Sequence, residues 1–267
     1  MHRADATARD AVADPSEVTG LIADTIPFSL VDGPGNRFAV FLQGCNMDCV
    51  ACHNPQTIPG HSPIEGHHPV RRSVGDLLDD IRRAAPFVSG VTVSGGEATQ
   101  QPAFLAALFE AIKADPDLRR LSCLVDSNGA CEPAVWDRLA PVFDGAMIDL
   151  KCLDPDIHLR MTGAPNDQVL HSIEHLHSID RLTEVRLLIL RGVNDGTGLI
   201  RSTGAWLAAV DPTMRIKVIG FRSHGARPHD PPLEEPTCGD LDRVVEVLHG
   251  EAAFDVDVVP AQLSAAT

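Results

Sequence analysis

The sequence predicts an α/β fold in which six strand–helix units curl into a partial barrel. Two observations support this prediction. Short apolar runs rich in β-branched residues alternate with longer amphipathic stretches along most of the chain, and this pattern is typical of β/α units around a parallel sheet. Polar and glycine-containing segments follow the apolar runs, where the loops of a parallel barrel share one mouth. The alternation alone fits an open, doubly wound sheet equally well; the polar loops favour the barrel.

Each predicted strand is a short apolar run, and each predicted helix shows apolar residues at helical spacing or a start signal. The strands are expected over residues 37–43, 90–94, 121–126, 145–150, 184–190 and 215–221. The helices are expected over 73–85, 102–114, 133–139, 168–179, 198–210 and 240–249. Ser73 is a plausible N-cap for the first helix, whose residues Val74, Leu77, Leu78 and Ile81 repeat with helical spacing.

Composition limits the class of protein. Hydrophobic residues make up 44% of the 267 residues and charged residues 22%, as in an ordinary globular protein. The polar segment 1–18 is interpreted as a flexible N-terminal extension, and residues 19–267 as one domain. No apolar stretch of about 18 residues is present, so no membrane partner is expected. The net charge of −15 argues against a nucleic-acid partner, because phosphate binding needs a basic surface.

The cysteines indicate a reducing compartment. The chain has seven, an odd number, and three of them fall between residues 45 and 52. This distribution does not resemble the disulfide framework of a secreted protein. In a reducing cytosol, clustered thiols more often bind a metal or take part in chemistry. A cytoplasmic location is therefore expected.

Cys45, Cys49 and Cys52 have the spacing C-x3-C-x2-C, directly after the first predicted strand. Three thiolates on one loop can bind three corners of an iron–sulfur cluster, because soft, strongly donating ligands suit iron–sulfur centres. A [4Fe–4S] cluster held by only three thiolates leaves one iron open to another ligand. The alternative is a structural zinc site with His53 as the fourth ligand. Adjacent Cys and His side chains do not easily reach one tetrahedral ion, and no second ligand pair follows at finger spacing.

This cysteine motif in a β/α chain resembles that of the radical S-adenosylmethionine (SAM) superfamily. The flanking sequences resemble the glycyl-radical-enzyme activases, of which pyruvate formate-lyase activating enzyme is the best-known member. They are Ser-Leu-Val-Asp-Gly-Pro-Gly-Asn-Arg at 29–37, Gln-Gly-Cys at 43–45 and Cys-His-Asn-Pro at 52–55. The resemblance extends from about residue 20 to residue 249.

The resemblance implies two cofactors, SAM and a [4Fe–4S] cluster held by Cys45, Cys49 and Cys52. The loop Ser-Gly-Gly-Glu at 94–97 is expected to bind the amino group of SAM, and the segments 126–128 and 149–151 to contact SAM and help to coordinate a monovalent cation. Independently of the family, an ionised lysine suits a carboxylate, and Asp or Asn can hydrogen-bond ribose hydroxyls. The expected cofactor-binding residues are Ala51, His53, Gly95, Gly96, Glu97, Asp126, Ser127, Asn128, Asp149, Leu150, Lys151, Arg186, Arg222 and His224. Which of Arg222 and His224 reaches SAM is left open.

Nearly all of these residues lie at or just beyond the C-terminal ends of predicted strands; Arg186 lies within its strand. In a parallel β/α barrel these ends meet at one mouth, where active sites are built. The convergence favours a partial (β/α)6 TIM-like barrel over the open sheet.

The expected reaction is reductive cleavage of SAM at the cluster. By resemblance, the resulting 5′-deoxyadenosyl radical removes a hydrogen atom from a glycine Cα in a partner glycyl radical enzyme, and reduced flavodoxin or ferredoxin donates the electron. The segment Asp32, Gly33, Pro34 and Gly35 is expected to face the partner's glycine-bearing loop. Two alternatives are a radical SAM enzyme with another substrate and a non-catalytic iron–sulfur electron-transfer protein.

Three further strings resemble the YjjW-type activases in particular: Cys-Leu-Val-Asp-Ser-Asn-Gly at 123–129, Asp-Gly-Ala-Met at 144–147 and Gly-Gly-Glu-Ala-Thr at 95–99. That group usually carries a ferredoxin-like insert with extra cysteines after the first loop. The corresponding segment, 56–69, contains no cysteine. The chain therefore resembles a version without the insert.

Overall fold

The computed structural model describes residues 15–58 and 68–261. In these residues one mixed sheet has the strand order β3-β1-β2-β4-β5-β6-β7-β8-β9. The strands are β1 (Thr19–Ser29), β2 (Arg37–Leu42), β3 (Val70–Ser73), β4 (Gly90–Gly95), β5 (Ser122–Ser127), β6 (Gly145–Asp149), β7 (Leu182–Ile189), β8 (Arg215–Gly220) and β9 (Asp255–Val259). From β2 to β9 neighbouring strands are parallel, whereas β1 pairs antiparallel with both β2 and β3.

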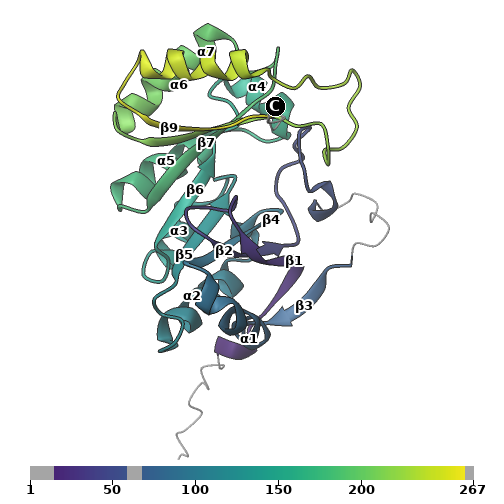
Figure 1. The fold of residues 1–267 in the computed structure, drawn as a ribbon, viewed down its shortest axis with the longest axis vertical. Coiled ribbons are helices and arrows are strands. Elements are labelled where there is room, and N and C mark those ends of the chain that lie inside the picture. Colours follow the sequence, from purple (N-terminus) through teal and green to yellow (C-terminus); the bar gives the residue numbers. More distant parts are fainter. Residues whose placement is uncertain (1–14, 59–67, 262–267) are drawn as a thin grey trace, which may run out of the picture.

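The helices follow the strands as the sequence predicts. They are α1 (Val74–Ala84), α2 (Pro102–Ala114), α3 (Pro133–Leu139), α4 (Pro155–Thr162), α5 (Asp167–Ser178), α6 (Thr197–Val210) and α7 (Cys238–His249). Figure 1 shows the sheet as a curved arc with α1, α2, α3, α5 and α6 along its outer side. Short 3-10 helices cover Pro15–Glu17 (η1), Pro55–Thr57 (η2), Ala85–Phe87 (η3) and Ala98–Gln100 (η4). No helix of the described segments is long and apolar enough to cross a membrane.

The partial barrel is confirmed. Strands β4, β5, β6, β7 and β8 are each followed by an α-helix, and β2 is followed by α1 after η2 and the short edge strand β3. The parallel register of these six strands brings their C-terminal ends to one side of the sheet. Strands such as β2 and β4 are almost wholly buried, as expected for parallel strands that are covered on both faces. Four elements were not expected from the sequence: β1, β3, β9 and α4.

The ends of the domain are described in part. Residues 1–14, most of the expected N-terminal extension over 1–18, lie outside the described residues. Pro15–Glu17 form η1, which packs against α1 and α2, and the Val18 carbonyl accepts a hydrogen bond from the Val74 N–H at 2.9 Å. The division into an extension and one domain over 19–267 stays a prediction.

Candidate active site

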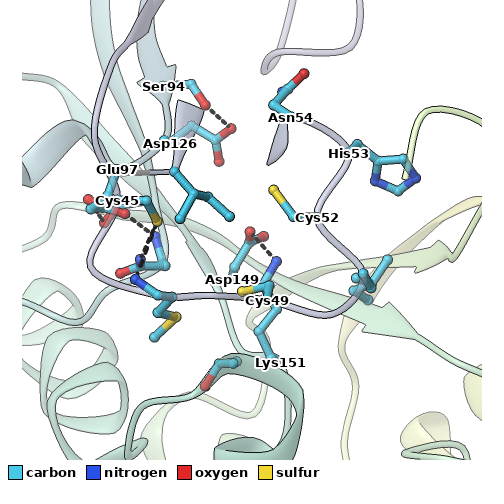
Figure 2. A pocket seen from close by; sticks show the side chains of 18 of the residues that line it. Cys45, Cys49, Cys52, His53, Asn54, Ser94, Glu97, Asp126, Asp149 and Lys151 are labelled. Atoms are coloured by element: carbon cyan, nitrogen blue, oxygen red, sulfur yellow. Dashed lines mark hydrogen bonds and ion pairs between the residues drawn. The ribbon is translucent and has the colours of Figure 1, made fainter. Parts of the chain in front are cut away.

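A cavity opens at the C-terminal ends of the parallel strands and brings most of the expected site residues together. It holds about 1070 Å³ of empty space, counted out to its open mouth. Figure 2 shows the three cysteines around this space, with Cys45 next to Glu97 and Cys49 next to Asp149 and Lys151. The cavity is lined by Cys45, Met47, Cys49, Ala51, Cys52, His53, Asn54, Ile58, Ser94, Gly95, Gly96, Glu97, Asp126, Ser127, Asn128, Asp149, Lys151, Met161, Thr162, Arg186, Leu188 and Ile219.

Two glycines allow the loop after β4 to pack against the start of the cysteine loop. Gly95 has φ +123°, and a Cβ on it would lie 2.1 Å from the Leu42 backbone nitrogen. A Cβ on Gly96 would lie 2.2 Å from the Gly44 carbonyl oxygen. Only glycine fits these close backbone approaches. The Glu97 N–H then donates to the Gly44 carbonyl at 2.7 Å, which ties the two loops together.

The three cysteines are free, half-buried thiols on one loop. Burial raises the pKa of Cys45 to about 12 and also raises the pKa values of Cys49 and Cys52. A metal must therefore displace the protons of these thiols when it binds. Three soft donors of one loop, in a cavity that polar and charged side chains also line, fit a [4Fe–4S] cluster that keeps one iron for another ligand.

The zinc alternative finds no support in this arrangement. His53, which that alternative requires as fourth ligand, has its Nε2 2.8 Å from the Arg222 carbonyl oxygen, and its ring lies against Phe221. Within residues 15–58 and 68–261, no three His, Cys, Asp or Glu side chains are grouped around a position for a single metal ion.

Glu97 is buried, with 1% of its surface exposed, and its carboxylate joins the loop after β4 to the loop after β5. Its Oε1 accepts hydrogen bonds from the Thr99 N–H, the Thr99 hydroxyl and the Ser127 hydroxyl. Its Oε2 accepts one from the Asn128 N–H at 2.7 Å. Burial raises the pKa of Glu97, and these donors act in the opposite direction. The structure thus gives Glu97 a structural task in addition to its expected place at the SAM amino group.

Asp126 and Arg186 form a buried ion pair on the floor of the cavity. Arg186 Nη1 donates to Asp126 Oδ1 at 2.9 Å, and its Nε donates to Glu184 Oε1 at 2.7 Å. Burial raises the pKa of Asp126, and Arg186 opposes this effect. The Ser94 hydroxyl donates to the second oxygen of Asp126 at 2.9 Å. Arg186 and Ser94 therefore fix the orientation of this carboxylate.

Asp149 and Lys151 form a second pair beside Cys49. Lys151 Nζ donates to Asp149 Oδ2 at 2.7 Å. Burial lowers the pKa of Lys151, but Asp149 and Cys49 outweigh it, so the pKa ends above its usual value and the ammonium stays charged. Cations and carboxylates side by side, facing three thiols, suit a ligand that carries both an ammonium and a carboxylate.

Three expected cofactor residues do not line the cavity. The Leu150 side chain is 1% exposed and belongs to the hydrophobic core. Arg222 Nη2 donates to the Pro260 carbonyl at 3.0 Å, so its guanidinium faces the chain after β9. His224, in the same loop, is exposed. Contact of these residues with SAM stays a prediction.

The segment Asp32–Gly35, which is expected to face the partner, lies before the N-terminal end of β2, whereas the cavity lies at the C-terminal ends of the parallel strands. The Asp32 side chain accepts a hydrogen bond from the Ser29 hydroxyl, and the Asp32 carbonyl accepts one from the Thr92 hydroxyl at 2.7 Å. A Cβ on Gly33 would lie 3.3 Å from Met147 Sδ, which itself accepts from Arg186 Nη2. The segment thus reaches Met147 in the barrel interior, and Met147 in turn contacts Arg186, which lines the cavity.

Several residues that line the cavity were not expected from the sequence. Met161 and Thr162 come from α4, an element that was not expected. Asp154 before the helix, Pro155 at its first position and Gly163 after it are nevertheless ordinary start and stop signals. Ser94 belongs to the expected 94–97 motif, but its hydrogen bond to Asp126 could not be read from the sequence. Leu188 and Ile219 are apolar strand residues without a recognisable motif.

Comparisons with known proteins agree with this site. Residues 39–199 match the Radical SAM superfamily. The chain is 32% identical over 217 residues to a pyruvate formate-lyase-activating enzyme of Streptococcus mutans, covering 79% of this chain and 81% of the relative. It is 33% identical over 241 residues to a putative glycyl-radical enzyme activating enzyme of Haemophilus influenzae, covering 79% and 86%.

Solved structures show the same fold. QueE from Escherichia coli superimposes with a TM-score of 0.59 at 14% identity, covering 95% of this chain and 100% of that one. The C-x3-C-x2-C loop lies inside residues 39–199, the region that matches the Radical SAM superfamily. The chain therefore belongs to the radical SAM superfamily and, within it, to the glycyl-radical-enzyme activating enzymes.

Proposed function

We propose that this protein cleaves SAM reductively at a [4Fe–4S] cluster and activates a glycyl radical enzyme. One observation supports this proposal above all: three free cysteines of one loop line the same cavity as Asp126, Asp149, Lys151 and Arg186. A cluster held by these cysteines would supply the electron that cleaves SAM into methionine and a 5′-deoxyadenosyl radical. That radical would take a hydrogen atom from a glycine Cα of the partner and leave a glycyl radical and 5′-deoxyadenosine.

The residues of the chain would bind the cluster and SAM and orient them toward each other. Cys45, Cys49 and Cys52 would hold three irons. Gly95 and Gly96 bring the backbone to the cluster loop, where it can accept an ammonium, and charged Lys151 suits a carboxylate. Asp126, Ser127 and Asn128 would receive ribose hydroxyls, and Asp126 with the backbone near Asp149 and Leu150 is the proposed place for a monovalent cation.

The partner would approach the end of the barrel that holds Asp32–Gly35. Next to this segment, Phe28, Leu30, Val31 and Phe87 are exposed, Leu30 by 80%. Phe28 and Phe87 contact each other edge to face, with ring centroids 5.9 Å apart. Neighbouring exposed apolar side chains are typical of a protein-binding surface. They support a protein rather than a small molecule as the substrate.

The electron donor and the compartment belong to the same proposal. A reduced flavodoxin or ferredoxin would supply the electron. Every cysteine of the described segments is a free thiol, which suits a reducing compartment such as the cytoplasm.

The test is transfer of the radical to a partner. The protein, reconstituted with iron and sulfide under anaerobic conditions, is mixed with SAM, dithionite and a glycyl radical enzyme encoded in the same genome, and electron paramagnetic resonance (EPR) is recorded. A glycine-centred radical is expected, and its signal should disappear when the partner's radical glycine is changed to alanine. Formation of 5′-deoxyadenosine with every candidate partner but no radical on any of them would contradict the activase assignment and favour another substrate.

A further inference from the structure

The middle of the cysteine loop, residues Asp48 to Val50, is held on one side by α4. The Asp48 N–H donates to the Thr162 carbonyl at 2.8 Å, and the Val50 N–H donates to the Met161 carbonyl at 2.9 Å. The last carbonyls of a helix have no partner within the helix and need one elsewhere. The last turn of α4 and the cysteine loop therefore satisfy each other.

Arg227 holds two of these residues, Asp48 and Cys49, on the other side. Its Nη2 donates to the Asp48 carbonyl at 2.6 Å and to the Cys49 carbonyl at 2.7 Å. Its Nη1 donates to Asp48 Oδ1 at 2.7 Å. Arg227 comes from the long segment between β8 and α7, far from the cysteines in the sequence. Its side chain is 20% exposed, whereas that of Asp48 is 62% exposed.

These contacts fix the backbone that carries Cys49. The Asp48 peptide N–H is bound to α4, while the following two carbonyls are bound to Arg227, so Cys49 cannot shift without breaking hydrogen bonds on both sides. A planar guanidinium can serve all three acceptors at once because its donors have a fixed fork geometry, which a lysine lacks.

Arg227 also places a permanent positive charge beside the thiols. Its Nη2 lies 2.7 Å from the carbonyl oxygen of Cys49, so the guanidinium charge is next to a residue that would hold the cluster. Reduction adds one negative charge to a cluster, and net charge and hydrogen bonding around a cluster set its reduction potential. A cation at this position stabilises the reduced cluster more than the oxidised one.

We propose that Arg227 is a positioning residue for the iron–sulfur cluster, which clamps the Asp48–Val50 backbone against α4 and raises the reduction potential of the cluster. The proposal depends on cluster binding and is independent of which glycyl radical enzyme is activated. A failed partner assay would leave it standing.

The test separates the clamp from the charge. Arg227→Gln removes the guanidinium hydrogen bonds and the positive charge. Arg227→Lys keeps the positive charge but lacks the guanidinium geometry that binds several acceptors. Asp48→Asn removes a neighbouring negative charge, while the carbonyl acceptors of Asp48 and Cys49 remain. Arg82→Gln is the control, because Arg82 on α1 is likewise an ion-paired arginine, bound to Asp79 and Asp115, and does not line the cavity. Each reconstituted protein is measured for iron per chain, for the rate of iron loss to a chelator, and for midpoint potential by EPR-monitored redox titration.

In Arg227→Gln, the ratio of reduced to oxidised cluster at a fixed potential should fall about tenfold, which is about 59 mV for a one-electron couple. Arg227→Lys should keep the wild-type potential but lose iron faster, and Asp48→Asn should shift the potential upward. Arg82→Gln should match wild type. Wild-type potential and iron loss in Arg227→Gln would overturn the proposal. If that variant holds no cluster, a midpoint in Asp48→Asn equal to or below that of wild type would overturn the charge effect.

Discussion

Glu97 connects three loops around the cavity through one buried carboxylate. It accepts hydrogen bonds from Thr99, Ser127 and Asn128, while its own N–H binds the Gly44 carbonyl. Each of these donors would be buried without a partner if the carboxylate were lost, and an unsatisfied buried donor is costly. The residue therefore stabilises the geometry on which the neighbouring cysteines and glycines depend.

Glu97→Gln should destabilise the protein by about 1–3 kcal/mol, because an amide keeps one acceptor oxygen and turns its NH2 group toward a donor. The measurement is urea unfolding of the metal-free protein. Glu132→Gln is the matched control; Glu132 is exposed and accepts a single hydrogen bond from Gln168, so its change should stay within about 0.5 kcal/mol. Equal stability of the two variants would mean that the carboxylate is not the acceptor described here.

At the scale of elements, α4 supports the cysteine loop through its last two carbonyls. The helix has eight residues, an N-cap at Asp154 whose side chain accepts from the Ile157 N–H at 2.9 Å, and a left-handed C-cap at Gly163. A helix this short depends strongly on its caps and on tertiary contacts. Loosening α4 should therefore loosen the metal site.

Asp154→Ala should lower the free energy of unfolding by about 1 kcal/mol and should also accelerate loss of iron from the reconstituted protein. Ser73→Ala removes an equivalent cap from α1, where the Ser73 hydroxyl accepts from the Asp76 N–H at 3.1 Å. This control should lose a similar stability without faster iron loss. Thermal unfolding and chelator kinetics measure the two effects. Identical iron loss in both variants would contradict support of the loop by α4.

The elements that the sequence predicts carry a repeated pattern of buried residues, whereas the elements that it does not predict lack such a pattern. The parallel strands and their helices repeat one buried pattern, which periodicity detects. Strand β1 contains Pro27 and is exposed along its second half, β9 alternates Asp and Val at a sheet edge, and α4 is too short to show a helical period. These elements depend on pairing and packing with distant segments. Arg227 could not be predicted for the same reason: its contacts to Asp48 and Cys49 join residues 179 and 178 positions apart in the sequence.

At the scale of the whole molecule, the parallel register delivers loops from successive strands to one cavity. The cysteine loop follows β2, the glycine turn follows β4, and the segments around Asp126 and Asp149 end β5 and β6. Because each loop follows its own strand, the order of strands and motifs along the chain is enough to assign distant motifs to one site. The sheet ends in β3 and β9 rather than closing, which leaves the partial barrel with two sheet edges.

The most direct test of the account is formation of 5′-deoxyadenosine from SAM and dithionite by the anaerobically reconstituted protein. Cys49→Ala removes one of the three cavity thiols, and Cys238→Ala removes an exposed thiol at the start of α7 as the matched control. The account predicts product from the wild type and from Cys238→Ala, and none from Cys49→Ala. A wild-type protein that holds four irons and makes no product, or a Cys49→Ala variant with undiminished activity, would contradict it.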